Sequence, residues 1–123
     1  MAMQNPYNNY TNNAIFTASK EELTLMLYEG ALKFTNQAYL AIENKDFIKA
    51  NELIIRVEDI IREFQITLNP KFEISKNFAS MYDYIYRRLI DANISKDLVI
   101  LAEARDLIRE FRDMWKSAMH AAR

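Results

Sequence analysis

Only three residues in this 123-residue chain, one glycine and two prolines, are strong breakers of regular structure. A protein of many short strands needs frequent turns, which glycine and proline usually supply. Long helices joined by short turns need few such residues. Half of the residues are hydrophobic, and the length suits one domain with a single core. The sequence therefore predicts an all-α domain of long helices.

Capping signals place the ends of these helices. Ser19 is followed at the third position by Glu22, which is the capping-box pattern of a helix start. Asp46 and Ser95 are predicted to cap later helices, and Pro70 is predicted to stop one. The predicted helices are 20–44, 47–68, 73–92 and 96–121. Because the connections are short, we expect an antiparallel up-down-up-down four-helix bundle over residues 20–123.

Residues 1–19 differ in composition from the rest of the chain. They contain no charged side chain, and five asparagines alternate with aromatic residues that include Tyr7 and Tyr10. Asparagine competes with helix by hydrogen-bonding to nearby backbone. A freely solvated tail is usually charged and poor in aromatics. We therefore predict an irregular N-terminal arm that packs on the bundle.

Each predicted helix carries an apolar row at spacings of three and four residues, which is the pattern of a buried helix face. In the first two helices the predicted core rows are Leu23, Leu27, Ala31, Phe34, Ala38 and Ile42, then Phe47, Ala50, Ile54, Val57, Ile61, Phe64 and Leu68. In the last two helices they are Ile74, Phe78, Met81, Ile85, Leu89 and Ala92, then Leu101, Ala104, Ile108, Phe111, Trp115, Ala118 and Ala122.

Three of the helices carry a second apolar row, here called an outer row, on the side away from the predicted core. The outer rows are Leu25, Tyr28, Leu32 and Tyr39, then Ile48, Ile55 and Ile66, then Phe72, Ala79, Tyr86 and Ile90. The fourth helix has mainly Val99 there. Single exposed apolar residues are common, but contiguous apolar surface usually marks an interaction site. Such a surface suits an amphipathic helix or a second copy of the chain, and the pattern does not separate the two.

The composition argues against a catalytic site or a metal site. The chain has no cysteine and one histidine, His120, so it lacks the ligand sets of zinc and di-iron sites. Phosphotransfer through a helical bundle needs an exposed histidine in mid-helix, whereas His120 lies in the last turn. The sole glycine, Gly30, lies within a predicted helix and predicts close approach of a neighbouring helix or the arm. We expect neither an enzyme nor a cofactor.

The charge balance bears on the partner class. The formal net charge of −1 argues against nucleic acid as the main partner, because such binding usually uses a basic patch. No apolar run reaches the roughly 20 residues that span a bilayer, and the N-terminus lacks a signal-peptide pattern. We therefore expect a cytoplasmic protein without membrane insertion.

Several segments resemble the flagellar secretion chaperones for flagellin. The segment Ala18-Ser19-Lys20-Glu21-Glu22-Leu23-Thr24-Leu25-Met26-Leu27-Tyr28-Glu29-Gly30-Ala31 resembles their opening helix, and Asn5-Pro6-Tyr7 with Tyr10 resembles the preceding arm. The segments Tyr84-Ile85-Tyr86-Arg87-Arg88-Leu89-Ile90-Asp91-Ala92-Asn93 and Phe111-Arg112-Asp113-Met114-Trp115 resemble later parts. Lys20 departs from the family, which often has proline there, and this affects only helix initiation.

The resemblance implies a chaperone that binds the C-terminal region of flagellin in the cytoplasm. It implies that the bound segment cannot polymerise and that the complex is delivered to components of the flagellar type III export apparatus. It implies no catalysis and no cofactor. Together with the outer rows, it predicts these partner-binding residues: Tyr7, Tyr10, Leu25, Tyr28, Leu32, Ile48, Ile55, Ile66, Tyr86 and Ile90. The chain is expected to be a monomer or weak dimer, and the alternative is a homodimeric structural or regulatory bundle that uses the same surface.

Overall fold

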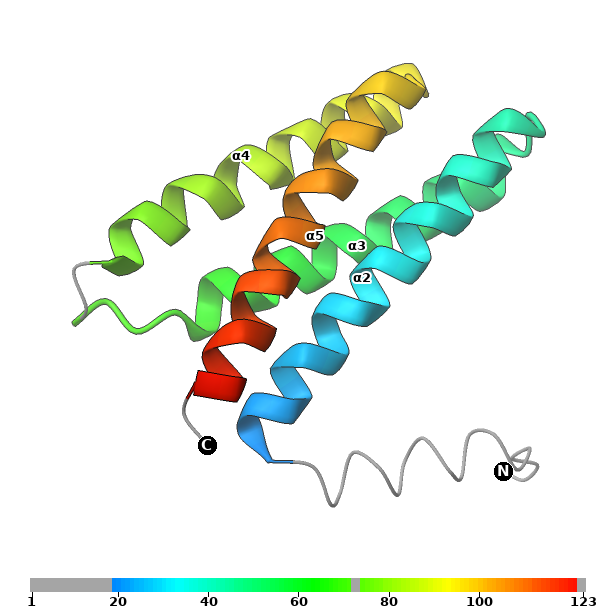
Figure 1. The fold of residues 1–123 in the computed structure, drawn as a ribbon. Helices are drawn as coiled ribbons and strands as arrows, with labels where there is room; N and C mark the ends of the chain where they lie inside the picture. The colour runs from blue at the N-terminus through cyan, green and yellow to red at the C-terminus, as the bar shows by residue number, and fades with distance from the viewer. Residues whose placement is uncertain (1–18, 72–73, 122–123) are drawn as a thin grey trace, which may run out of the picture.

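A computed structural model describes residues 19–71 and 74–121, which form four helices. They are α2 (Lys20–Glu43), α3 (Phe47–Thr67), α4 (Ile74–Ser95) and α5 (Leu98–Ala121). Each helix packs against its sequence neighbour, and α5 packs against α2 to close the ring (Figure 1). The all-α up-down-up-down bundle predicted from the sequence is confirmed. The predicted arm, including Tyr7 and Tyr10, lies outside the described residues.

The predicted start of α2 and the predicted cap Asp46 of α3 are confirmed, whereas α2 ends at Glu43 instead of at residue 44. The backbone amide of Glu22 donates to Ser19 Oγ at 3.1 Å, as a capping box requires. At the next turn, Asn44 is the C-cap of α2, and Lys45 after it adopts the left-handed conformation with φ of 60°. The amide of Lys49 then donates to Asp46 Oδ1 at 3.2 Å, so Asp46 caps α3.

The turn between α4 and α5 differs from the prediction. Helix α4 extends to Ser95 instead of ending at residue 92, and α5 begins at Leu98. The predicted cap Ser95 donates its hydroxyl back to the carbonyl of Asp91 at 2.9 Å, so it still belongs to α4. Lys96 has φ of 56° and breaks the helix. Asp97 is the cap of α5, because its Oδ1 accepts from the amide of Val99 at 2.8 Å.

The core confirms the central parts of all four predicted rows, since Ala31, Ala38 and Ile42 of α2 are buried as predicted. The largest fully buried side chains are Ile54, Val57, Ile61, Ile85, Leu89, Leu101 and Ile108 of α3, α4 and α5. Three predicted core positions of α3, α4 and α5 are wrong, because Phe47, Met81 and Ala118 are exposed, and Trp115 is half-buried at the edge of the core. Trp115 instead donates its ring N–H to the carbonyl of Glu21 at 3.0 Å, which joins the end of α5 to the start of α2.

The buried side of α2 is wider than the predicted row, because it includes two residues of the outer row as well as Ala31, Ala38 and Ile42. Tyr28 and Leu32, placed on the outer row, are only 4% and 7% exposed, whereas the predicted core residue Leu27 is 36% exposed. The cause is a contact with α4, since the hydroxyl oxygens of Tyr28 and Tyr82 lie 2.7 Å apart in the core. The Tyr28 ring also lies 4.3 Å from the ring of Phe64, centroid to centroid. The prediction that Tyr28 and Leu32 face outward is therefore wrong.

The expectation for Gly30 is also not met among the described residues. A Cβ atom built on Gly30 would have the Cδ1 atom of Ile60 on α3 as its neighbour, at 3.9 Å. This is an ordinary van der Waals distance, so the packing of α2 against α3 does not require a glycine here.

Candidate partner-binding surface

The outer row of α3 lies on the surface, as predicted. Ile48, Ile55 and Ile66 are 80%, 42% and 74% exposed. Asn51 and Arg62 share this side of α3, because Asn51, Ile55, Arg62 and Ile66 follow one another at spacings of four, seven and four residues. The stripe therefore runs along most of the length of α3.

Two contacts show that this stripe borders α4. The side-chain amide of Asn93 donates to Asn51 Oδ1 at 2.7 Å, and Arg62 Nη2 donates to Tyr86 Oη at 3.1 Å. Tyr86 and Asn93 lie on α4 seven residues apart, and Ile90 lies between them on the same side. The outer rows predicted on α3 and α4 therefore meet. We call this surface, formed by Ile48, Ile55, Ile66, Tyr86 and Ile90, the α3/α4 face.

The two helices differ in how far these side chains are exposed. Tyr86 and Ile90 are half-buried, whereas the three isoleucines of α3 stand further out. Tyr86 is held by Arg62, whose guanidinium carbon lies 4.7 Å from the centroid of the Tyr86 ring. The α3/α4 face thus combines half-buried side chains of α4 with a row of exposed aliphatic side chains of α3.

The remaining predicted residues lie elsewhere. Leu25 is half-buried beside Lys116 and Met119 of α5, on the side of the ring opposite the α3/α4 face. Tyr28 and Leu32 are in the core, as described above. Tyr7 and Tyr10 lie outside the described residues. The structure therefore brings together five of the ten predicted residues, and all five come from α3 and α4.

Exposed apolar residues near two turns were missed as site candidates. Leu40, Phe47, Ile94 and Val99 are all exposed, and they flank the turns between α2 and α3 and between α4 and α5. Both turns lie at the same end of the bundle (Figure 1). The periodic row of its helix predicts Phe47 in the core. Its exposure is better indicated by its position as the first residue of α3, directly after the cap, where few other side chains surround it.

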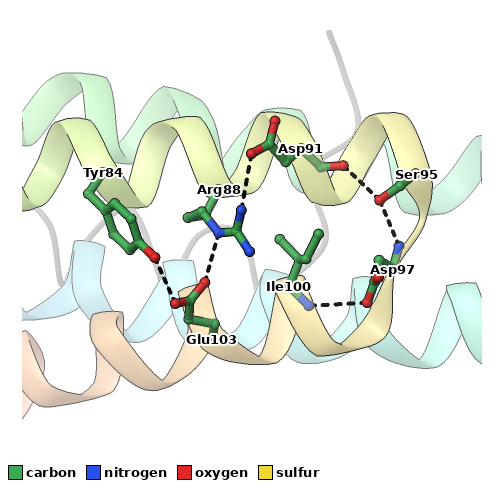
Figure 2. A network of polar contacts seen from close by, with 7 residues as sticks. All are labelled: Tyr84, Arg88, Asp91, Ser95, Asp97, Ile100 and Glu103. Atoms are coloured by element: carbon green, nitrogen blue, oxygen red, sulfur yellow. Dashed lines mark hydrogen bonds and ion pairs between the residues drawn. The ribbon is translucent and has the colours of Figure 1, made fainter.

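The opposite side of α4 has a different chemistry. Figure 2 shows Tyr84 and Arg88 of α4 pointing toward Glu103 of α5. Tyr84 donates to Glu103 Oε2 at 2.8 Å, and Arg88 Nε donates to Glu103 Oε1 at 2.7 Å. These hydrogen bonds lower the pKa of Glu103, and the bond to Glu103 raises the pKa of Tyr84. Arg88 also pairs with Asp91 at 3.3 Å. We call this surface the α4/α5 face.

The described part of the chain consists of residues 19–71 and 74–121. They contain no group of three or more histidine, cysteine, aspartate or glutamate residues arranged to hold a metal ion. None of the four helices has the length and apolar character needed to cross a membrane.

Known proteins show what this bundle is similar to. The chain matches the family described as "Flagellar protein FliS" over residues 3–122. It is 49% identical over 123 residues to "Flagellar secretion chaperone FliS" of Bacillus subtilis (strain 168), a match covering 100% of this chain and 92% of that protein. The protein of the same description from Escherichia coli (strain K12) is 29% identical over 110 residues, covering 87% and 81%.

A solved structure described as "Crystal structure of flagellar chaperone from bacteria" matches with a TM-score of 0.77 and 17% sequence identity. The match covers 94% of this chain and 95% of that one, and it shows that the two share a fold. The names of the sequence relatives describe chaperones, which are not a class of enzyme. The chain belongs to the FliS family of flagellar secretion chaperones.

Proposed function

We propose that this chaperone binds the C-terminal region of flagellin through the α3/α4 face in the cytoplasm. Covering the apolar surface of that region prevents premature polymerisation, and the complex is delivered to the flagellar type III export apparatus. The observation that carries the proposal is the exposed row of Ile48, Ile55 and Ile66 beside Tyr86 and Ile90. Aliphatic rows at helical spacing suit the apolar stripe of an amphipathic helix.

The energetics are compatible with capture followed by release. Fully burying an isoleucine side chain contributes about 1.5–3 kcal/mol. Ordering a disordered partner segment costs about 2–5 kcal/mol or more, which offsets part of the gain from several such side chains. The outcome is a specific complex of moderate affinity, which an export chaperone needs because it must give up its cargo.

Tyr7 and Tyr10 of the arm are proposed to take part in partner binding, either by contacting flagellin or by covering apolar surface until it arrives. Removal of residues 1–18 changes flagellin affinity on either reading. If the arm contacts flagellin, the truncated chain binds more weakly than the full chain. If the arm covers the binding surface, the truncated chain binds more tightly. Unchanged affinity would remove both tyrosines from the set of partner-binding residues.

Calorimetric titration with a peptide from the C-terminal region of the cognate flagellin tests the proposal. We expect one-to-one binding with a negative heat-capacity change, which marks burial of apolar surface. Ile55→Asp should lower the affinity at least about tenfold, because a charge replaces a side chain that the partner covers. Met114→Asp is the matched control, because it places the same charge at an exposed apolar position of α5.

Two results would contradict the proposal. Absence of binding at several temperatures by a folded wild-type chain would remove flagellin as the partner. A stable homodimer in sedimentation experiments that dissociates on Ile55→Asp would assign the α3/α4 face to a second copy of the chain.

A further inference from the structure

Arg62 interrupts the aliphatic row of the α3/α4 face. It follows Ile55 after seven residues and precedes Ile66 by four, so it lies on the same side of α3 as both. A lysine or arginine at such a position usually extends into water. Arg62 instead lies against the ring of Tyr86 on the neighbouring helix.

The guanidinium of Arg62 is fixed in place with most of its donors free. Its Nη2 donates to Tyr86 Oη at 3.1 Å, and its Cζ lies 4.7 Å from the ring centroid. A guanidinium has five N–H donors, so one bond leaves four for another partner. A planar cation held by stacking and one hydrogen bond is oriented before a ligand arrives, and this reduces the entropy cost of binding.

The carboxylates near Arg62 in the chain form no ion pair with it among the described residues. Glu63 follows Arg62 directly, and Glu58 and Asp59 lie one turn earlier on α3, but none of the three is paired with Arg62. Burial raises the pKa of Glu58, and the charge of Arg62 opposes this rise without a direct contact. Asp83, which precedes Tyr86 on α4, is paired with Arg87 at 3.1 Å. The face therefore carries an oriented cation without an ion-pair partner among the described residues.

We propose that Arg62 receives a carboxylate of the partner segment, so that the partner is an amphipathic helix whose apolar stripe carries one aspartate or glutamate. This inference rests on the proposed function and names a determinant of specificity within it. The guanidinium fork matches a carboxylate in two parallel hydrogen bonds, which fixes the register of the partner along α3. Apolar contacts alone would allow the partner to slide by one turn.

The spacing on α3 sets the spacing on the partner. A seven-residue separation spans about 10.5 Å of helix and a four-residue separation spans about 6 Å. A partner helix that packs nearly parallel or antiparallel to α3 meets these positions at similar intervals. The carboxylate is therefore expected about four residues from one apolar anchor and about seven from another on the other side.

Calorimetric titration of arginine variants with the C-terminal flagellin peptide tests this inference. Arg62→Glu should weaken binding by about tenfold or more, because two carboxylates then face each other. Arg62→Gln keeps the shape and should weaken it less, with an affinity that depends less on salt than that of the wild type. Arg109→Glu is the matched control, because Arg109 is an exposed arginine of α5 that already pairs with Asp106.

A second series identifies the carboxylate. Each aspartate and glutamate of the peptide is changed singly to lysine and titrated against Arg62→Glu. One such change is expected to restore most of the lost affinity, because it recreates an ion pair of reversed sign. Failure of every peptide variant to restore affinity would overturn the inference.

The outcomes separate this inference from the proposed function. If Arg62→Glu binds like the wild type while Ile55→Asp does not, the inference is wrong and the proposed function stands. If the folded wild-type chain does not bind the peptide, the proposed function fails and the inference fails with it. Thermal unfolding of each variant checks that the bundle is intact.

Discussion

The two sides of α4 present opposite kinds of surface. Toward α5, the α4/α5 face holds Tyr84, Arg88 and Glu103 in hydrogen bonds within the chain (Figure 2). Toward α3, the α3/α4 face exposes isoleucines and has one arginine with free donors. The polar groups of the first surface satisfy one another, whereas the apolar side chains of the second remain in water. On the proposed function, a partner is therefore expected to cover the α3/α4 face and to gain little from the α4/α5 face.

The largest expected effect is on stability. It tests whether the side of α2 that carries Leu32 is buried and therefore lies outside the candidate surface. Leu32→Ala should lower the free energy of unfolding by about 2–4 kcal/mol, because it leaves a cavity in the core. Leu27→Ala, on the half-exposed side of the same helix, should cost about 1 kcal/mol or less. Urea denaturation measures both. Equal losses would mean that Leu32 is not buried as the structure shows, and the outer row of α2 would rejoin the candidate surface.

The next effect contrasts the two faces directly. The double variant Ile55→Asp with Ile66→Asp should lower flagellin affinity by about a hundredfold, since two covered aliphatic side chains are replaced by charges. The double variant Tyr84→Phe with Glu103→Gln should leave the affinity within about twofold, because an exposed and internally paired surface contributes little to binding. Calorimetric titration of both against the same peptide measures the contrast. The reverse ranking would move the binding surface to the α4/α5 face.

A smaller effect concerns Gly30, which lies on neither face. Because a Cβ atom fits beside Ile60, Gly30→Ala should raise the free energy of unfolding by up to about 1 kcal/mol. Flagellin affinity should not change. A stabilised variant that binds flagellin more weakly would show that a partner approaches the α2 backbone here, and the binding surface would extend beyond the α3/α4 face.

The smallest effect tests the internal pairing of the α4/α5 face through pH. Hydrogen bonds from Tyr84 and Arg88 lower the pKa of Glu103 in the folded chain. This ionised carboxylate therefore stabilises the fold above the ordinary pKa of glutamate, and the contribution is lost as the pH falls through the lowered value. Glu103→Gln removes this contribution. The difference in the free energy of unfolding between wild type and variant should therefore disappear on acidification. An equal gap at neutral and acidic pH in urea denaturation would contradict it. The effect is small because exposed pairs are screened by water.

Much of the fold was predictable because its signals are local. The caps Ser19 and Asp46 act on residues two or three positions away, and the periodic rows of α3 and α5 are read within one helix. The turn from α4 to α5 was not predictable in this way. Lysine carries no signal for the left-handed conformation that both Lys45 and Lys96 adopt, because glycine and asparagine are the residues usually found there. At the first turn Asp46 still marks the next helix, whereas at the second the cap is Asp97 and not the predicted Ser95.

The missed part of the candidate surface has a nonlocal cause. Helix α2 is apolar on more than one side, so the row of Leu23 and Leu27 and the row of Tyr28 and Leu32 were equally good core candidates by period alone. The contact between Tyr28 and Tyr82, 54 residues apart in the chain, accompanies the burial of the second row. On α3 the outer row was predictable, because only one of its sides forms an unbroken apolar row.

Methyl NMR of the isoleucine-labelled chain tests most directly whether flagellin binds the α3/α4 face. Ile48, Ile55, Ile66 and Ile90 report on the face, whereas Ile54 and Ile108 report on the core. On titration with the C-terminal flagellin peptide, we predict that the four reporters of the face shift or broaden first and most strongly. Binding that leaves these four methyl signals unchanged would contradict the account, because the partner would then cover a different part of the bundle.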